Sequence, residues 1–213
     1  MHLKSQILSV LNNKHDFLSG FSQKFEEPKE NIDPAFNQII NSVIYSLNIQ
    51  CILNRRVDEI CMIAKECSQI NFNRRGLLSN LDIIIKGNGT NSELIGDRFG
   101  GIVDIISQQS GLKSGSVNKL FAVLTPAILS NIYFHYKAHN YTYQQLSFYL
   151  DKLTKRNQPD PKIKYGLIGL IKNVEIRDAL QLQQPKQQHP LSRFVYSLSD
   201  FWQQKISWNF RFD

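Results

Sequence analysis

The sequence predicts an all-α fold, a multi-helix bundle, on three observations. Apolar residues recur at helical spacing, as at Phe36, Ile39 and Val43 in residues 31–53. Glycine, proline and capping residues divide the chain into helix-sized segments. The composition, 42% hydrophobic and 20% charged over 213 residues, is that of a globular protein with enough chain for one large or two small domains.

The first elements are three helices. Residues 1–17 form an amphipathic helix whose apolar side carries Leu3, Ile7, Val10, Leu11 and Phe17. Residues 31–53 follow, with Asp33 as N-cap and Pro34 as the first helical residue. Residues 55–70 form the third helix.

The middle of the chain predicts three more helices. Residues 73–91 form a short helix that Gly87 and Gly89 close. A helix over 92–111 begins with Asn91 or Ser92 as cap and stops at Gly111.

The helix over 114–140 is the longest, with Ser114 or Ser116 as cap. Pro126 is expected to kink or divide it, because proline lacks the N–H group and clashes with the preceding turn.

The last helices are bounded by clear signals. Thr142 and Gln145 form a capping box for residues 142–155, and residues 157–161 are a turn before a helix over 162–182. Residues 183–213 are a polar linker and an aromatic tail. In the tail Ile206, Trp208, Phe210 and Phe212 alternate with polar residues, as in a strand that docks on the body or pairs with another chain.

A weak internal repeat divides the helical part into two related modules, 1–75 and 76–182. When Phe21 is aligned with Ile106, Ser22-Gln23 meets Ser107-Gln108, and apolar positions agree for nearly thirty residues, Phe36 with Phe121 among them. A duplication explains this agreement, and so do two amphipathic helices that share a phase.

Residues 106–121 have the spacing of a helix-turn-helix, with Ser107 as the small residue and Gly111 in the turn. Gly111, Leu112 and Pro126 are the structural residues of this motif. In a DNA reader the outward side chains would meet phosphates and base edges; these are Lys113, Ser114, Ser116, Asn118 and Lys119. Any tight helix corner needs the same glycine, and the first repeat has Glu26 in its place.

The charge of the chain suits nucleic acid, anionic lipid or an acidic protein as a partner. The net charge is +7, and residues 105–172 hold nine basic residues against Asp151 and Asp160, which equals the whole excess. The same charge also suits a solvated surface.

Residues 100–172 resemble the YidB-like bacterial family, domain of unknown function number 937. Gly111-Leu112, Leu124, Pro126 and Leu129 carry the first half of this resemblance. The second half rests on a further set: Leu146, Leu150, Gly166, Leu167 and Leu170. The resemblance implies a small bacterial all-helical protein with a helix-turn-helix-like corner and no established activity. Some members are fused to peptidoglycan-binding domains, which implies an envelope link.

Constellations for catalysis, cofactors or metals are missing from the sequence, so we expect a non-enzyme without cofactor or metal. Cys51, Cys61 and Cys67 form no CxxC pair and fit reduced cytosolic thiols better than a zinc site. His135 and His139 lie four apart without the glutamate of an HExxH motif.

We expect a cytoplasmic protein without a membrane span. The apolar run 120–134 is short and interrupted, and the N-terminus lacks the features of a signal peptide.

The stretch IYFHYKAHNYTY, residues 132–143, mixes aromatic and basic residues. Most of these rings are expected in the core, although such interleaving also suits base stacking or a partner surface. The sequence thus predicts a non-catalytic interaction or scaffold protein that binds a protein partner or itself. The alternative is a nucleic-acid-binding protein that uses the corner and the basic region.

Overall fold

The computed structural model describes residues 3–11, 14–72, 76–172, 176–177 and 180–181. Within these ranges the all-α prediction is confirmed. The α-helices are α1 (Leu3–Val10), α2 (Lys14–Phe25), α3 (Lys29–Asn48), α4 (Val57–Ser68), α5 (Leu81–Ile95), α6 (Phe99–Ser110), α7 (Ser114–Ala138), α8 (Tyr143–Arg156) and α9 (Pro161–Ile168). Shorter turns are η1 (Ile49–Leu53), a π-helical continuation of α3, and the 3-10 turns η2 (Leu77–Ser79) and η3 (Gly96–Arg98).

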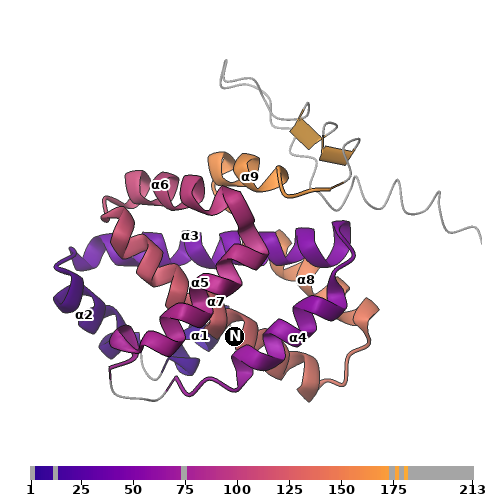
Figure 1. Ribbon diagram of the computed structural model, residues 1–213, viewed down its shortest axis with the longest axis horizontal. Coiled ribbons are helices and arrows are strands. Elements are labelled where there is room, and N and C mark those ends of the chain that lie inside the picture. Colours follow the sequence, from indigo (N-terminus) through magenta and orange to yellow (C-terminus); the bar gives the residue numbers. More distant parts are fainter. Residues whose placement is uncertain (1–2, 12–13, 73–75, 173–175, 178–179, 182–213) are drawn as a thin grey trace, which may run out of the picture.

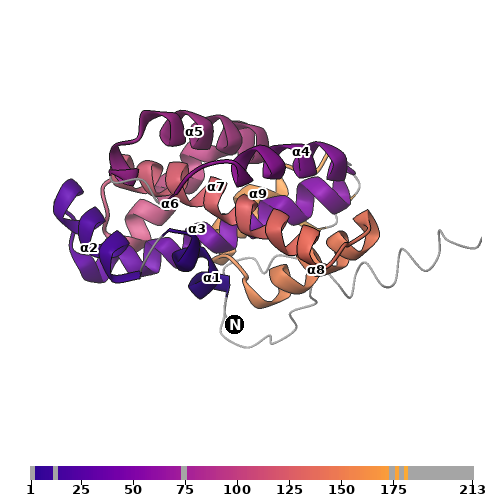
Figure 2. The same ribbon diagram turned by 90° about the horizontal axis from the view of Figure 1, so that it is seen from below.

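The centre of the fold is α7, which the other helices surround (Figure 1). From Leu120 to Ser130 every residue of α7 is buried. Turned by 90°, the molecule has α4 and α5 on one side of α7 and α1 and α8 on the other (Figure 2). An amphipathic helix needs one covered stripe, so burial on all sides marks α7 as the core of the bundle.

A single hydrophobic cluster runs through the described residues, from Leu3 in α1 to Leu180. Its largest fully buried side chains include Tyr45 and Phe36 in α3 and Phe121 in α7. Burial of a phenylalanine side chain such as Phe36 or Phe121 contributes about 1.5–3 kcal/mol to stability. The predicted modules 1–75 and 76–182 therefore share one core, while the predicted linker and tail, 183–213, lie outside the described residues.

A very close crossing of two helices joins α5 to α7 at Gly87. A Cβ atom on Gly87 would lie 1.8 Å from the carbonyl oxygen of Ala122. In a regular helix that carbonyl accepts a hydrogen bond from the N–H of residue 126. Pro126 has no N–H group, and the backbone of α5 at Gly87 packs against the carbonyl instead. One turn on, the buried Thr125 hydroxyl donates to Asn91 Oδ1 at 2.6 Å.

The predicted break at Gly87 and Gly89 is therefore wrong, as is a new helix capped by Asn91 or Ser92. Gly87 is present for close packing, and α5 continues through both glycines to Ile95. It ends at Gly96, whose positive φ of 57° suits glycine. Asn80 caps its start by accepting from the backbone N–H of Asp82.

Two predicted features near the N-terminus are also wrong. The single helix over 1–17 is two helices, α1 and α2. Helix α3 begins at Lys29 after Pro28, so Asp33 is not its cap and Pro34 lies inside the helix. The Asp33 carboxylate instead accepts from Lys4 Nζ at 2.7 and 2.8 Å, which ties α1 to α3.

Helix α7 also differs from its prediction at both expected landmarks. Lys113 occupies the N-cap position and no side chain caps the helix, so Ser114 and Ser116 are not caps. Pro126 does not divide α7, which runs unbroken over 25 residues. The surrounding helices hold this segment in place, and their packing outweighs the lost backbone hydrogen bond.

The capping box of α8 is confirmed. The backbone N–H of Gln145 donates to Thr142 Oγ1 at 3.3 Å, and that of Thr142 donates to Gln145 Oε1 at 2.8 Å. The turn after α8 is also found, and Asp160 caps α9. The prediction of one helix over 162–182 is met only in part: α9 ends at Ile168, and residues 176–177 and 180–181 are helical.

Candidate functional site

The corner between α6 and α7 has the predicted helix-turn-helix form. Gly111 takes a φ of 74°, which only glycine adopts without strain. The Ser107 hydroxyl donates to the carbonyl oxygen of Leu112 at 2.6 Å across the turn. Leu112 itself is buried, so Gly111 and Leu112 have the structural role that the sequence predicts.

The five predicted binding residues do not form one open surface. Lys113 and Ser114 are exposed, whereas Asn118 and Lys119 are half-buried. Ser116 is only 5% exposed, so its predicted outward position is wrong. It faces the core because α7 is covered on several sides from its first turn onward. The Ser114 hydroxyl is also near Asp104 Oδ1, at 3.4 Å.

The N-terminus of α7 is already bound by a carboxylate of the protein. The backbone N–H of Lys113 donates to Glu27 Oε1 at 3.1 Å, and Glu27 is 5% exposed. A helix N-terminus attracts anions, and here the Glu27 carboxylate already accepts from one of its backbone N–H groups. A recognition helix also needs an open face several turns long near the corner, which α7 lacks because every residue from Leu120 to Ser130 is buried.

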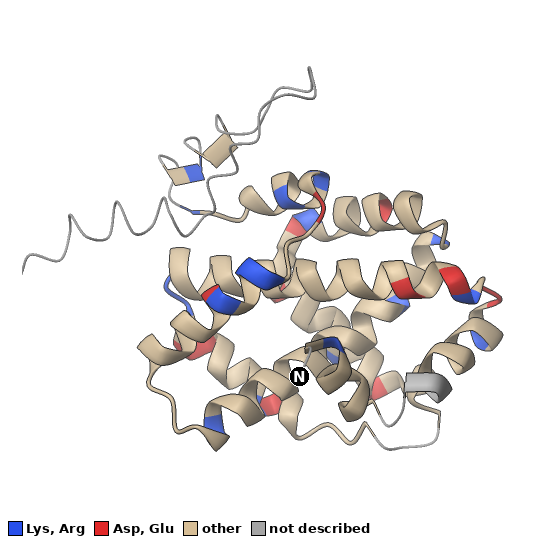
Figure 3. Ribbon diagram, turned by 180° about the vertical axis from the view of Figure 1, so that it is seen from behind, with Lys and Arg blue, Asp and Glu red and all other residues tan. Residues whose placement is uncertain are grey.

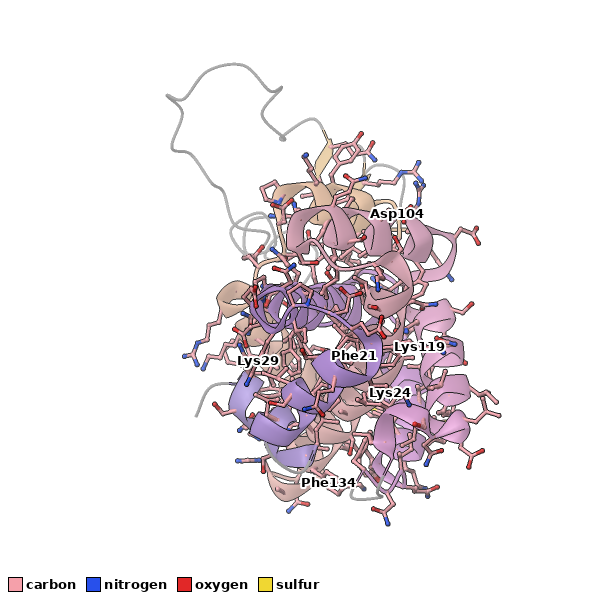
Figure 4. The ribbon with its side chains drawn as sticks, turned by 90° about the vertical axis from the view of Figure 1, so that its left-hand side faces the viewer. Phe21, Lys24, Lys29, Asp104, Lys119 and Phe134 are labelled. Atoms are coloured by element: carbon pink, nitrogen blue, oxygen red, sulfur yellow. The ribbon has the colours of Figure 1, made fainter. Side chains whose placement is uncertain are left out.

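Charges near the corner are mixed. Lys24, Lys29 and Lys119 lie on the same side of the molecule as Asp104 (Figure 4). Over the helices basic and acidic positions are interspersed rather than gathered into one basic face (Figure 3). The excess of positive charge in residues 105–172 therefore does not form the continuous stripe that duplex DNA binding favours.

A second surface gathers aromatic and basic side chains where α7 ends and α8 begins. We call it the aromatic end; its members are Tyr133, Phe134, His135, Tyr136, Lys137, His139, Tyr141, Tyr143, Phe148, Tyr149 and Lys152. None of these side chains is fully buried. Of the rings in residues 132–143, Tyr133 and Tyr136 are partly buried against the core, but Phe134 and Tyr143 are exposed, so the expectation that most of them pack in the core is not met. Phe134, Tyr143 and Phe148 are 55%, 50% and 62% exposed. The aromatic end lies on the opposite side of the molecule from α2 (Figure 1).

Lysines at the aromatic end lie over rings. Lys137 Nζ is 5.8 Å from the centre of the Tyr133 ring and 5.7 Å from that of Tyr136. Lys152 Nζ is 4.9 Å from the centre of the Phe148 ring. Exposed cation–π pairs of this kind contribute about 0.5–1 kcal/mol each and favour these positions of the lysines over the rings.

Histidines form the middle of the aromatic end. The His135 ring is 4.1 Å from that of His139 and stacks on Tyr149 at 4.2 Å. Partial burial, and then His139, lower the pKa of His135. Burial raises the pKa of Tyr149 to about 12, so its hydroxyl stays protonated. Among the described residues no group of three or more His, Cys, Asp or Glu side chains could hold a metal ion.

A small apolar pocket lies beside the aromatic end, between α3, α4, α7 and α8. Its lining residues are Leu47, Ile60, Cys61, Ala64, Ile132, Tyr133, Tyr136, Leu146 and Leu150. Burial, and then the nearby Asp58 carboxylate, raise the pKa of the Cys61 thiol. A thiol held protonated in this way is a poor nucleophile.

One helix of the described residues, α7, is long and apolar enough to cross a membrane. Of its most apolar 18-residue window, 72% is buried inside the protein. The core helix of a soluble protein meets the same criteria, so this finding decides neither for nor against a membrane span. The predicted absence of a span and the predicted cytoplasmic location stay predictions.

Comparison of the chain with protein-family models, curated proteins and solved structures gives no match. The resemblance of residues 100–172 to the YidB-like family therefore stays a prediction. The aromatic end is a candidate site whose residues the sequence pattern singles out but assigns to the core. The signal for it is the interleaving of rings with Lys137 and the histidines.

Proposed function

We propose that the chain is a non-catalytic interaction protein that binds a partner protein through the aromatic end. The observation that supports this is the exposure of Phe134, Tyr143 and Phe148 together with two lysines that lie over rings, Lys137 over Tyr133 and Lys152 over Phe148 itself. Aromatic side chains on rigid helices bring large contact areas at low entropic cost, which is why they dominate binding energy at protein interfaces.

The charge of the aromatic end favours an acidic partner. Lys137, Lys152 and Arg156 lie on this part of the chain. Of the carboxylates near them, Asp151 is paired with Lys155 at 3.0 Å, and Asp58 of α4 forms a hydrogen bond with Tyr143. A second copy of the chain would bring the same positive charges to the interface. Like charges facing each other cost energy, so self-association through this surface is disfavoured.

The experiment compares three forms of the full chain. These are the parent, a surface variant Phe148→Ala/Lys152→Glu, and a control variant Leu81→Ala/Lys113→Glu. Leu81 is 66% exposed and Phe148 62%, so both variants lose an exposed apolar side chain and reverse one charge. A protein captured from the native host by the parent is purified, and its dissociation constant is measured by calorimetry with all three forms.

We expect the surface variant to bind at least about tenfold more weakly, which corresponds to loss of one interface anchor. The control variant should bind as the parent does. Equal affinity for all three forms would contradict a role for the aromatic end. Circular dichroism of each variant checks that the fold is retained.

A second candidate function, nucleic-acid binding, is favoured by the same mixture of rings and lysines. Single strands stack bases on aromatic side chains and place phosphates near lysines, so they fit the aromatic end better than a duplex fits the α6–α7 corner. Fluorescence anisotropy with oligothymidine and with a random duplex, at low and physiological salt, tests this. Single-strand binding that Phe148→Ala/Lys152→Glu abolishes and Lys113→Glu/Lys119→Glu leaves intact would select this candidate. Duplex binding that is lost only in Lys113→Glu/Lys119→Glu would instead identify the α6–α7 corner as the nucleic-acid-binding site.

A further inference from the structure

The α2–α3 corner has the same backbone course as the α6–α7 corner, 85 positions later. Helices α2 and α6 begin at 14 and 99 and end at 25 and 110, and α3 and α7 begin at 29 and 114. Glu26 has a φ of 52° and Gly111 a φ of 74°. The Ser22 hydroxyl donates to the Glu27 carbonyl at 2.7 Å, as that of Ser107 does to Leu112 at 2.6 Å.

The correspondence continues beyond the corners. Arg55 and Asn140, again 85 apart, have φ values of 56° and 50°. Helices α4 and α8 then begin at 57 and 143, which adds one residue to the offset. With that offset Ile60 and Ala64, which are buried in α4, correspond to the buried Leu146 and Leu150 of α8. On the outer faces Met62 and Phe148 correspond, at 61% and 62% exposure.

Two amphipathic helices in phase do not account for these correspondences. A shared apolar phase sets which side chains are buried, but not the sign of φ at a turn. A non-glycine residue with positive φ is uncommon, so Glu26 and Arg55 are informative. Of the alternatives that the sequence left open, the structure favours duplication.

Part of the packing between the halves is reciprocal. Helix α4 packs on α7, and its counterpart α8 packs on α3. Helix α1 contacts α7, and α5, whose end at Ile95 corresponds to the end of α1 at Val10, contacts α3. The helices α3 and α7 contact each other. In these pairs each helix and its counterpart exchange partners, as at an isologous two-fold interface. The symmetry is not complete: among the described residues α6 packs on α3 and α5 packs on α7, whereas the counterpart pairs, α2 with α7 and α1 with α3, have at most weak packing contacts.

We propose that the chain is a fused dimer of one 85-residue unit. Residues 3–87 and 88–172 meet about a pseudo-two-fold axis, and the surface that each unit presents to the other is one that fits a second copy of the same unit. The junction falls within α5, so this helix ends the first unit and begins the second. This inference does not depend on the proposed function.

One contact between the corners offers a sharp test. Glu27 Oε1 accepts from the backbone N–H of Lys113. The counterpart of Glu27 is Leu112, and the counterpart of Lys113 is Pro28, which has no N–H group. The symmetry-related pair thus lacks both the acceptor and the donor. If the interface is two-fold, a glutamate placed at 112 should accept from a backbone N–H introduced at 28, which would form the same hydrogen bond at the symmetry-related position.

The experiment measures thermal unfolding of four full-length forms. The first double variant is Glu27→Leu/Pro28→Lys, which leaves the N–H of Lys113 without its acceptor. The second is Leu112→Glu/Lys113→Pro, which leaves two carboxylates facing prolines. The quadruple variant combines all four substitutions, so that a glutamate at 112 can accept from a lysine N–H at 28.

We expect each double variant to melt roughly 5 °C or more below the parent, because a buried polar group loses its partner. The quadruple variant should regain at least half of the larger loss. A quadruple variant that melts below both double variants, with the two losses simply added, would overturn the two-fold relation. If a double variant does not fold, a folded quadruple variant still supports the proposal, and an unfolded one contradicts it.

Discussion

Glycine is required at position 87 because of the neighbouring helix that faces it, and not because of its own backbone conformation. It lies inside α5, where glycine is unfavourable, and it is retained because α7 approaches to contact distance at Ala122. Gly89 lies two residues later in the same helix and is exposed, and a methyl group added to it would meet nothing within 4 Å. Gly89 is therefore a suitable control for a substitution at Gly87, because the two lie in the same helix and differ in their surroundings.

We predict opposite effects of alanine at the two positions. Gly87→Ala should destabilise the protein by about 3 kcal/mol or more, because the methyl group overlaps the Ala122 carbonyl and the helices must separate. Gly89→Ala should stabilise it by about 0.5–1 kcal/mol through helix propensity. Urea denaturation followed by circular dichroism measures both. A Gly87→Ala variant as stable as the parent would show that α5 and α7 do not approach so closely.

The three thiols differ in their surroundings, and this predicts their reactivity. Burial raises the pKa of Cys51 to about 12 and of Cys67 to about 11, and both side chains are almost fully covered. Cys61 is only half-buried. Because the thiolate is the reactive form, we predict that Ellman's reagent at pH 8 modifies Cys61 first. Cys61→Ser should remove the fast phase, and all thiols of the parent should react at once in denaturant.

Single residues also show which features a sequence can predict. Gly111 is predictable as the turn residue because helix C-termini need a positive φ, which is a local requirement. Ser116 is predicted to point outward and is buried, because its exposure depends on helices distant in sequence. Gly87 resembles a helix end for the same reason, since a crossing with Ala122 leaves no trace in a short stretch of sequence.

At the scale of elements, the two corners make one turn with different residues. Gly111 adopts its φ of 74° at no steric cost, whereas Glu26 at 52° carries the penalty that a side chain has in the left-handed region. The turn is therefore held by its contacts, which include the Ser22 hydroxyl on the Glu27 carbonyl. Residue propensity therefore predicts the turn at Gly111 between α6 and α7, but not the turn at Glu26 between α2 and α3.

This difference predicts a pair of opposite stability changes. Glu26→Gly should stabilise the protein by about 0.5 kcal/mol, the relief of left-handed strain less the extra entropy of a glycine in the unfolded chain. Gly111→Ala should destabilise it by about 1–2 kcal/mol, and the added methyl would also meet Asn31 Nδ2 at 3.0 Å. Thermal melts of the two single variants measure this. Destabilisation by Glu26→Gly would mean that the Glu26 side chain has contacts worth more than the strain.

Helix limits are predicted well where a cap acts locally and poorly where packing decides. The Thr142 and Gln145 capping box lies within four residues of sequence, and its prediction is confirmed. The continuous course of α7 through Pro126 depends on neighbours that cover the helix on all sides, so the predicted division of the helix there is wrong. The α6–α7 corner is recognisable by its spacing, but its docking on Glu27 depends on the distant α2–α3 corner.

For the whole molecule, the shared core predicts a single cooperative unfolding transition. Helix α4 packs on α7 and α8 packs on α3, so neither half buries its central helix without the other. Both tryptophans, Trp202 and Trp208, lie outside the described residues, so calorimetry and circular dichroism are the suitable probes. The calorimetric and van't Hoff enthalpies should agree, as they do for a two-state unit.

Two substitutions in different halves test this cooperativity. Ala64 in α4 and Leu150 in α8 are both buried, at 3% and 1% exposure. Leu150→Ala should cost about 2–5 kcal/mol through the cavity it leaves, and Ala64→Gly about 1 kcal/mol through helix propensity. Each should move the whole transition and leave it single. A shared core requires every loss of packing to act on both halves. Two separated transitions, with Leu150→Ala shifting one and Ala64→Gly the other, would therefore show that residues 3–87 and 88–172 fold as independent domains.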